Sequence, residues 1–222
     1  MKHNKAPGPD GIPAECYRGE GSLATAAIAV FNAILSSGRY PDAWRTALLV
    51  PLLKNWRLDP TQPPHYRPIS LQVTLAKIFA AILERRLAAF LGTVKGICPA
   101  QFGFTRGRQG TDAVFILSTL IEKARAERKD LYVAFIDFSK AYDSVDHASM
   151  QAKLLLEGIC GRVYTVLQSM YEHVRSVVSQ GGCISRAIEH SIGLRQGCVL
   201  SPLLFALFIA DLPVFLARNG CA

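Results

Sequence analysis

Short apolar runs of strand length alternate along this chain with longer stretches that have the periodicity of a helix. Residues 47–53 (ALLVPLL) and 67–71 (RPISL) flank a polar, proline-rich stretch, which predicts a β-hairpin with an exposed tip. In residues 73–91, apolar side chains recur every three or four positions and charged side chains lie opposite them, which predicts an amphipathic helix. Without any internal repeat, this mixture predicts one α+β unit.

The remaining segments continue the alternation. Apolar spacing predicts a buried helix in residues 22–35 and another helix that Thr111 caps and that runs to about 128. Residues 131–138 (LYVAFIDF) form an apolar run rich in β-formers and predict a strand. Paired glycines predict a hairpin that turns at Gly181–Gly182. Further helices are predicted at residues 144–157, 161–173 and 200–217.

The charge balance favours a polyanionic partner. The chain has 25 Lys and Arg against 17 Asp and Glu, a net charge of +8 and a pI near 9.3. A nucleic acid is the first candidate for such a surface. The alternative is a basic surface that serves solubility alone.

The cysteines and the apolar runs bear on the protein's compartment. The six cysteines include no CxxC pair, which predicts reduced thiols that mostly pack in the interior. They are Cys16, Cys98, Cys160, Cys183, Cys198 and Cys221. The longest apolar runs fall short of the roughly 20 residues that a bilayer span needs, so we expect no membrane segment. The N-terminus lacks the apolar core of a signal peptide, so we expect an intracellular protein, cytoplasmic or nuclear.

Asp137 follows the apolar run LYVAFI and is the first candidate for chemistry. A strand can hold such a carboxylate rigidly at a solvent-reachable site, and Mg²⁺ prefers hard oxygen ligands. An Asp after an apolar run can also simply cap the following turn. A two-metal site needs more than one carboxylate, so Asp137 cannot form that site by itself.

A glycine-rich block, GLRQGCVLSP, begins at Gly193. Gly193 and Gly197 permit close approach of the backbone, and Gln196 offers both a hydrogen-bond donor and an acceptor to a base or a sugar. A glycine-rich turn before a helix accounts for the same local pattern.

Several blocks together carry a family resemblance. The segment FIDFSKAYDSV resembles the first palm motif of reverse transcriptases, and GLRQGCVLSP resembles the second. Five stretches, the last of which contains the second motif, resemble in order blocks of non-LTR (LINE-type) retrotransposon polymerases. They are KAPGPDGIPAE (5–15), WRTALLVPLLK (44–54), HYRPISLQVTLAKIFAAILERRL (65–87), QFGFTRGRQGTDAVF (101–115) and GLRQGCVLSPLLF (193–205).

The resemblance implies a right-hand polymerase fold of the α+β class. Residues 1–128 would form a fingers-like region, and residues 129–222 would form a partial palm with an antiparallel sheet. Together they would make one incomplete reverse transcriptase domain, truncated before the family's aromatic-x-Asp-Asp motif.

The resemblance also assigns roles within the first palm motif. Asp137 would be the catalytic metal ligand, and the backbone carbonyl of Phe138 would face the second metal. Tyr142 would be the gate that excludes a 2′-hydroxyl from the incoming sugar. The alternative for Phe138 and Tyr142 is that they are core aromatics.

Nucleotide and template contacts follow from the other blocks. Lys54 and Arg67, at the base of the predicted hairpin, would hold the triphosphate. Gln196 and Gly197 would lie against the nascent base pair. Arg108 would touch the template or buttress the fingers.

The block that contains Arg108 departs from the commoner family wording. Thr105 replaces the Arg that usually follows the Gly-Phe pair, and the match at Arg106 is weaker than that at Arg108.

The implied activity is RNA-directed DNA polymerisation, with two Mg²⁺ ions (Mn²⁺ is possible), an RNA template, a DNA primer and deoxynucleoside triphosphates. The resemblance leaves the oligomeric state open. One alternative is a catalytically dead remnant that at most binds nucleic acid. Another is an unrelated α+β enzyme that uses Asp137 with Asp143 or Asp146, which we otherwise expect to be helix-start or surface carboxylates.

Overall fold

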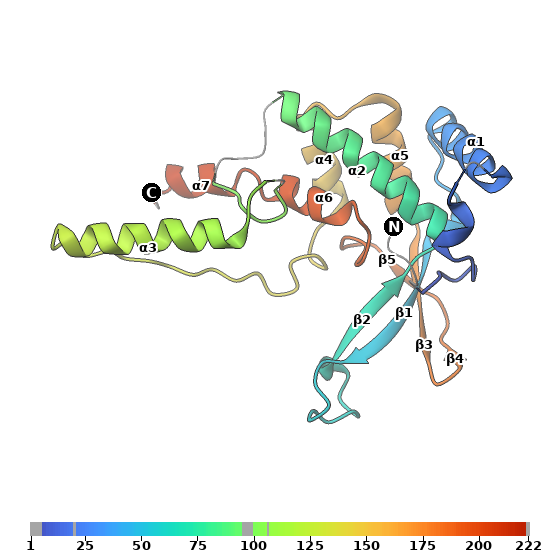
Figure 1. Ribbon diagram of the computed structural model, residues 1–222, viewed down its shortest axis with the longest axis horizontal. Helices are drawn as coiled ribbons and strands as arrows, with labels where there is room; N and C mark the ends of the chain where they lie inside the picture. The colour runs from blue at the N-terminus through green and yellow to red at the C-terminus, as the bar shows by residue number, and fades with distance from the viewer. Residues whose placement is uncertain (1–5, 20, 95–99, 106, 221–222) are drawn as a thin grey trace.

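The computed structural model describes residues 6–19, 21–94, 100–105 and 107–220. Helices gather at one end of a mixed β-sheet, and the sheet extends away from them (Figure 1). The chain thus has the mixture of helices and strands that the sequence predicts.

The sheet is built around β1 (Thr46–Leu53). β1 pairs antiparallel with β2 (Tyr66–Leu71), as predicted, and pairs in parallel with β3 (Val174–Gln180), which the sequence did not reveal. β4 (Cys183–Ile184) and β5 (Ile188–His190) both pair antiparallel with β3. The sheet is therefore mixed, whereas we expected an antiparallel one.

The hairpin of β3 and β4 turns at Gly181–Gly182, as predicted. Both glycines have positive φ angles, +59° and +81°, which the tight two-residue connection requires.

Most of the core lies between helices. α1 (Ser22–Ser37), α2 (Thr74–Val94), α4 (His147–Leu156), α5 (Gly161–Tyr171) and α6 (Ser201–Phe208) all contribute buried apolar side chains. Phe79 of α2 is completely buried among the rings of Phe31, Tyr40 and Trp44. Short 3-10 turns occur at Ala14–Tyr17, Asp42–Trp44 and Pro63–His65.

Two predicted helices differ from expectation. α1 buries only Ala27, Phe31 and Ile34, so it is a surface helix and not a buried one. The predicted helix 200–217 is divided into α6 and α7 (Leu212–Arg218). Pro213 explains the break, because its ring has no N–H to donate to the carbonyl four residues earlier and would clash with it.

The stretch Ser201–Arg218 is long and apolar enough, by length and composition alone, to cross a membrane. Run lengths in the sequence led us to expect no such stretch. Its first half, α6, packs into the core, and this packing accounts for the apolar character of that half.

α3 (Gly110–Ala126) extends away from the other helices, and residues 129–141 return along its length (Figure 1). α3 was predicted as a helix, and it buries none of its residues. Gln109 is its N-cap residue, so Thr111 lies inside the helix and does not cap it.

The predicted strand 131–138 is wrong. The segment has no regular secondary structure, and its side chains are exposed. Among the residues that the structure describes, no strand pairs with it. Its backbone groups therefore lack the ladder of hydrogen bonds that defines a strand.

The expectation of packed cysteines holds for Cys198 alone among the four that are described. Cys16, Cys160 and Cys183 are exposed free thiols. Cys98 and Cys221 lie outside the described residues.

Candidate active site

The loop between β5 and α6, residues 191–200, is hydrogen-bonded to the segment that precedes α4. The Gly193 N–H donates to the Val145 carbonyl and the Leu194 N–H donates to the Tyr142 carbonyl, both at 2.8 Å. A Cβ on Gly193 would lie 3.2 Å from the backbone of Asp143, and its φ is +93°. Glycine is therefore required where this loop meets the segment that contains Asp143.

Arg195 holds the same loop through its buried side chain. The sequence analysis did not identify this role. The Arg195 side chain is buried, with Nη2 donating to the Trp44 carbonyl at 2.6 Å and Nη1 donating to the Tyr40 hydroxyl at 3.3 Å. Its own carbonyl accepts a hydrogen bond from Ser201 Oγ at 2.8 Å. A buried guanidinium that joins two distant segments holds the loop in one position.

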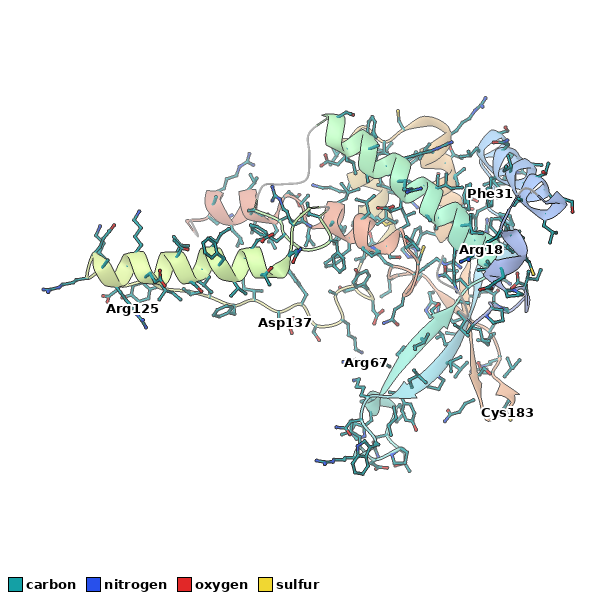
Figure 2. All side chains as sticks on the ribbon, in the orientation of Figure 1. Arg18, Phe31, Arg67, Arg125, Asp137 and Cys183 are labelled. Carbon is teal, nitrogen blue, oxygen red and sulfur yellow. The ribbon has the colours of Figure 1, made fainter. Side chains whose placement is uncertain are left out.

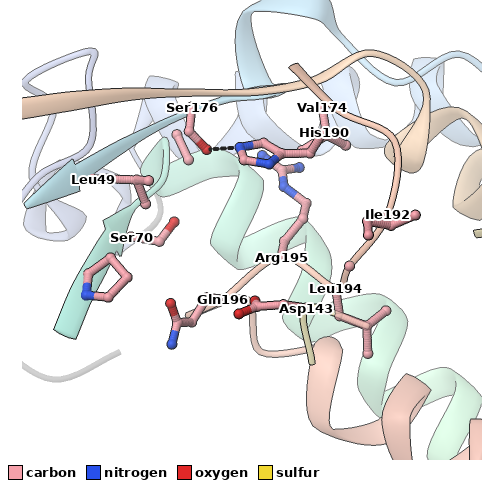
Figure 3. Close-up of a pocket in the computed structure, with 13 residues that line it drawn as sticks. Leu49, Ser70, Asp143, Val174, Ser176, His190, Ile192, Leu194, Arg195 and Gln196 are labelled. Atoms are coloured by element: carbon pink, nitrogen blue, oxygen red, sulfur yellow. Dashed lines mark hydrogen bonds between the residues drawn. The ribbon is translucent and has the colours of Figure 1, made fainter. Parts of the chain in front are cut away.

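A cavity of about 390 Å³ lies between this loop and the sheet (Figure 3). Gln196 and Asp143 lie beside one another at its wall. Ser176 Oγ and His190 Nε2 are 2.7 Å apart on the opposite side. The other lining residues are Ala47, Leu49, Pro68, Ser70, Val174, Ile192, Gly193, Leu194 and Arg195.

Gly197 brings the loop against β2. Its φ is +79°, and a Cβ there would lie 3.1 Å from the Ser70 carbonyl oxygen. Gln196 is exposed next to this contact. The structure thus brings Gln196 and Gly197 together with β2, so the two motif residues border the space between hairpin and loop.

Tyr142 is half-buried and packs against α6. Its ring stacks on Phe205 with centroids 5.1 Å apart and meets the edge of Phe104 at 6.2 Å. Burial raises the pKa of the Tyr142 hydroxyl above its ordinary value. The hydroxyl therefore stays protonated at neutral pH, and the ring is held in place by aromatic packing.

Asp137 and Phe138 lie away from the cavity. Both are exposed on the extended segment beside α3, and neither lines the cavity. Figure 2 labels Asp137 on this segment and Arg67 on the β1–β2 hairpin, so the two come from separate parts of the molecule. The structure does not bring Asp137 together with Gln196.

The two other acidic residues of this region differ in role. Asp143 lines the cavity. Asp146 is the N-cap of α4 and accepts hydrogen bonds from the N–H and Oγ of Ser149, both at 2.7 Å. These bonds lower the pKa of Asp146. The helix-start role predicted for Asp146 is confirmed.

Lys54 and Arg67 lie where the sequence predicted, at the end of β1 and the start of β2. Lys54 Nζ donates to the Pro64 carbonyl at 2.7 Å, and Arg67 lies opposite Leu52 in the ladder. Both side chains are exposed. Alternation along β2 directs Arg67 to the face opposite the cavity-lining Pro68.

Arg108 holds its own loop. Its Nη1 donates to the Gln101 carbonyl at 3.2 Å, and its guanidinium lies 5.4 Å from the centre of the Phe102 ring. Two roles were expected for Arg108, a template contact or a buttress of the fingers. These contacts within its own loop fit the second role. Arg106 lies outside the described residues.

Within the described ranges, no group of three or more His, Cys, Asp or Glu side chains is arranged to hold a metal ion. Asp137 supplies one hard oxygen donor of the kind that Mg²⁺ prefers. The described carboxylates therefore fit one ligand of a divalent-ion site but do not complete one.

Comparison with known families decides the identity of the chain. Residues 58–219 match the model of the family described as reverse transcriptase (RNA-dependent DNA polymerase). The chain belongs to the reverse transcriptase family. The match includes Arg67, Asp137, Tyr142 and Gln196, and it begins after Lys54.

The relatives are retrotransposon polymerases, which confirms the expected non-LTR group. The chain is 33% identical over 187 residues to the RNA-directed DNA polymerase from mobile element jockey of Drosophila melanogaster, covering 83% of this chain. It is 31% identical over 184 residues to the probable RNA-directed DNA polymerase from transposon BS of the same species. In both cases it covers 20% of the relative, so the chain spans about a fifth of their length.

Reverse transcriptases use divalent metal ions and act on RNA templates and nucleic-acid primers with deoxynucleoside triphosphates.

At the candidate site, the sequence analysis wrongly predicted a strand that carries Asp137, and it did not predict that Arg195 is buried. For Arg195 the available signal was a charged residue between Leu194 and the Gly-rich turn, but nothing in the sequence indicates which carbonyl it would bind.

Proposed function

We propose that this chain is the fingers and part of the palm of an RNA-directed DNA polymerase that performs nucleotidyl transfer. The observation that carries the proposal is the family match over residues 58–219, which includes the loop at Gln196 and the segment at Asp137. Residues 1–128 would be the fingers and residues 129–222 the palm portion of a right-hand polymerase. The protein would act inside the cell, in the cytoplasm or the nucleus.

The incoming nucleotide would lie beside exposed Gln196, on the face of the hairpin that bears Arg67 and outside the cavity that Pro68 lines. Gln196 and Gly197 would contact the nascent base pair, because Gly197 allows the loop to reach β2. Tyr142, fixed on Phe205, would exclude the 2′-hydroxyl of a ribonucleotide. These roles are supported by the position of Gln196, Gly197 and Tyr142 where the two motif segments meet.

Charged groups would handle the phosphates and the template. Lys54 and Arg67 would hold the triphosphate through charge-assisted hydrogen bonds. Arg108, which packs on Phe102, would support the fingers at the template.

Asp137 would bind Mg²⁺ together with the backbone carbonyl of Phe138. Two such ions, or Mn²⁺ in their place, would lower the barrier by polarising the reacting phosphate and neutralising the leaving group. The exposed position of Asp137 leaves its carboxylate open to a cation. RNA template and DNA primer would occupy the basic surface of the chain.

The proposal is tested with a chimera in which the aligned part of this chain, 83% of its length, replaces the matching segment of the jockey polymerase. We expect Mg²⁺-dependent, RNA-templated incorporation of deoxynucleotides by the purified chimera. Asp137→Asn should reduce the rate at least about a hundredfold, because the amide lacks the charge that the cation requires.

Asp130→Asn is the matched control, since Asp130 is also exposed on the segment after α3. Its rate should stay within about twofold of the unsubstituted chimera, because surface substitutions away from a site have small effects. The unmodified jockey polymerase shows that the assay works. A folded chimera that binds primer–template but incorporates nothing, or an active Asp137→Asn variant, would contradict the proposal.

A further inference from the structure

The tip of the β1–β2 hairpin, residues 54–65, presents an exposed tryptophan. Trp56 is 81% exposed, whereas the only other tryptophan of the chain, Trp44, is 7% exposed in the core. A single exposed apolar side chain is common and needs no function. Trp56 differs from such side chains because hydrogen bonds hold the loop around it and basic side chains lie near it.

The tip loop is fastened at its base and along its length. Lys54 N–H donates to the His65 carbonyl at 2.9 Å, which closes the base. Asp59 Oδ1 accepts from the N–H and Oγ1 of Thr61, and Tyr66 Oη donates to the Pro60 carbonyl at 2.9 Å. Three prolines, at positions 60, 63 and 64, further restrict the backbone. A loop held in this way presents its side chains with little entropy left to lose on binding.

Trp56 sits at the start of a turn that the loop fixes. Asn55 Oδ1 accepts a hydrogen bond from the Arg57 N–H at 3.0 Å, and the Leu58 N–H donates to the Asn55 carbonyl at 3.1 Å. The guanidinium of Arg57 lies 5.0 Å from the centre of the Trp56 ring. A cation on one face leaves the other face of the indole for a second flat group.

The charges of the hairpin favour an anionic partner. Residues 46–71 contain Lys54, Arg57 and Arg67 against the single acid Asp59. The Asp59 carboxylate is engaged by Thr61, and these hydrogen bonds lower its pKa. An apolar partner could contact only the single indole of Trp56. A partner with both flat rings and negative charges could contact Trp56 and the basic side chains as well.

We propose that the hairpin tip binds single-stranded nucleic acid, with an unpaired base stacked on Trp56 and phosphates beside Arg57. Stacking requires a base with a free face, which a single strand offers and a duplex conceals. Trp56 and Arg57 precede residue 58, where the family match begins, so these two side chains lie outside the matched residues. The proposal deepens the proposed function and rests on it for the kind of ligand, while its test measures binding and no catalysis.

Intrinsic tryptophan fluorescence tests it on the whole 222-residue chain. The probes are oligouridylate and oligothymidylate of about 12 nucleotides, within the usual site sizes, and a duplex of the same length. We expect both single strands to quench the emission of Trp56, while buried Trp44 provides a constant background. The ratio of the two affinities tells whether RNA or DNA is preferred.

Two variants separate stacking from charge. Because Trp56→Leu lacks the fluorescent reporter, binding by the parent and all variants is compared through the fluorescence anisotropy of dye-labelled oligouridylate and oligothymidylate. Trp56→Leu should weaken single-strand binding about fivefold or more and leave its salt dependence unchanged. Arg57→Gln should reduce the slope of log K against log salt by about 0.7, the value for one phosphate contact on a single strand. Phe115→Leu, at another exposed aromatic, on α3, is the matched control and should bind like the parent.

Thermal melting by circular dichroism checks that each variant keeps its fold. If Trp56→Leu binds both single strands as tightly as the parent, the proposal is overturned. Equal affinity and quenching with the duplex would overturn it as well. Because no catalysis is measured, an inactive chimera leaves this result unaffected, and a failure here leaves the polymerase proposal standing.

Discussion

Two segments of similar sequence character have different structures in this chain. β1 (TALLVPLL) and residues 131–138 (LYVAFIDF) are both apolar runs of strand length. β1 is hydrogen-bonded to β2 on one side and to β3 on the other, and most of its side chains are at least half-buried. Residues 131–138 have no such partners among the described residues, and Tyr132 and Phe135 are 90% and 84% exposed.

An apolar run of strand length forms a strand only when a neighbouring strand pairs with it. Apolar, β-favouring residues gain from a pleated surface only when a neighbour supplies hydrogen bonds and packing. The same difference bears on function. Gln196 lies on a loop fixed to the sheet and the core, whereas Asp137 lies on the unpaired segment.

Truncating one aromatic in each region gives the largest expected contrast. Phe79→Ala should lower the free energy of unfolding by about 3–5 kcal/mol, because it leaves a cavity among packed rings. Phe135→Ala should change it by less than about 0.5 kcal/mol, because that side chain is exposed. Urea unfolding followed by circular dichroism measures both. Similar losses in the two variants would mean that residues 131–138 are packed.

Two glycine substitutions test the contact between the loop at Gly197 and β2. Gly182→Ala should cost about 1 kcal/mol, because a Cβ is placed on a left-handed backbone in open space. Gly197→Ala has the same backbone cost and should lose about 1–3 kcal/mol more, because the Cβ would press on the Ser70 carbonyl. The same unfolding assay compares them. Equal costs would show that the loop and β2 are not in contact.

The smallest expected effect concerns the stability of the fold at acid pH, through Asp146. The pKa of Asp146 is lowered below its ordinary value of 3.8, chiefly by the Ser149 N–H. Its charge therefore stabilises the fold above pH about 4, and that contribution is lost as pH falls through the lowered pKa. Asp146→Asn keeps an acceptor at the helix start but cannot titrate.

The measurement is the unfolding midpoint of parent and variant between pH 7 and pH about 3. The variant should lose less stability than the parent on acidification. Asp146→Ala, which also removes the acceptor, should be less stable than Asp146→Asn throughout the range. An unchanged pH dependence in Asp146→Asn would show that this carboxylate does not cap α4.

Much of the fold could be predicted because its signals are local. The amphipathic period of residues 73–91 predicts α2, and the paired glycines at 181–182 predict the β3–β4 turn. Pairing between distant segments has no such signal. Thr46 lies beside Arg175 in the parallel ladder of β1 and β3, and the sequence gives no reason to join them.

The candidate site was predictable to a similar degree. The order of the motif blocks indicates the family, and the glycines at 193 and 197 indicate where the backbone must approach a neighbour. The role of Arg195 depends on carbonyl and hydroxyl groups about 150 residues away, which only the fold brings together. The exposure of Asp137 likewise depends on which strands are available to pair.

Hydrogen–deuterium exchange of the 222-residue chain tests the central contrast most directly. Amides of residues 46–53 bonded in the ladders should be protected, because they exchange only when the sheet opens. Amides of residues 131–138 should exchange at nearly the rate of an unstructured peptide. Protection of 131–138 equal to that of β1 would contradict the account, because it would show that the segment bearing Asp137 is already paired.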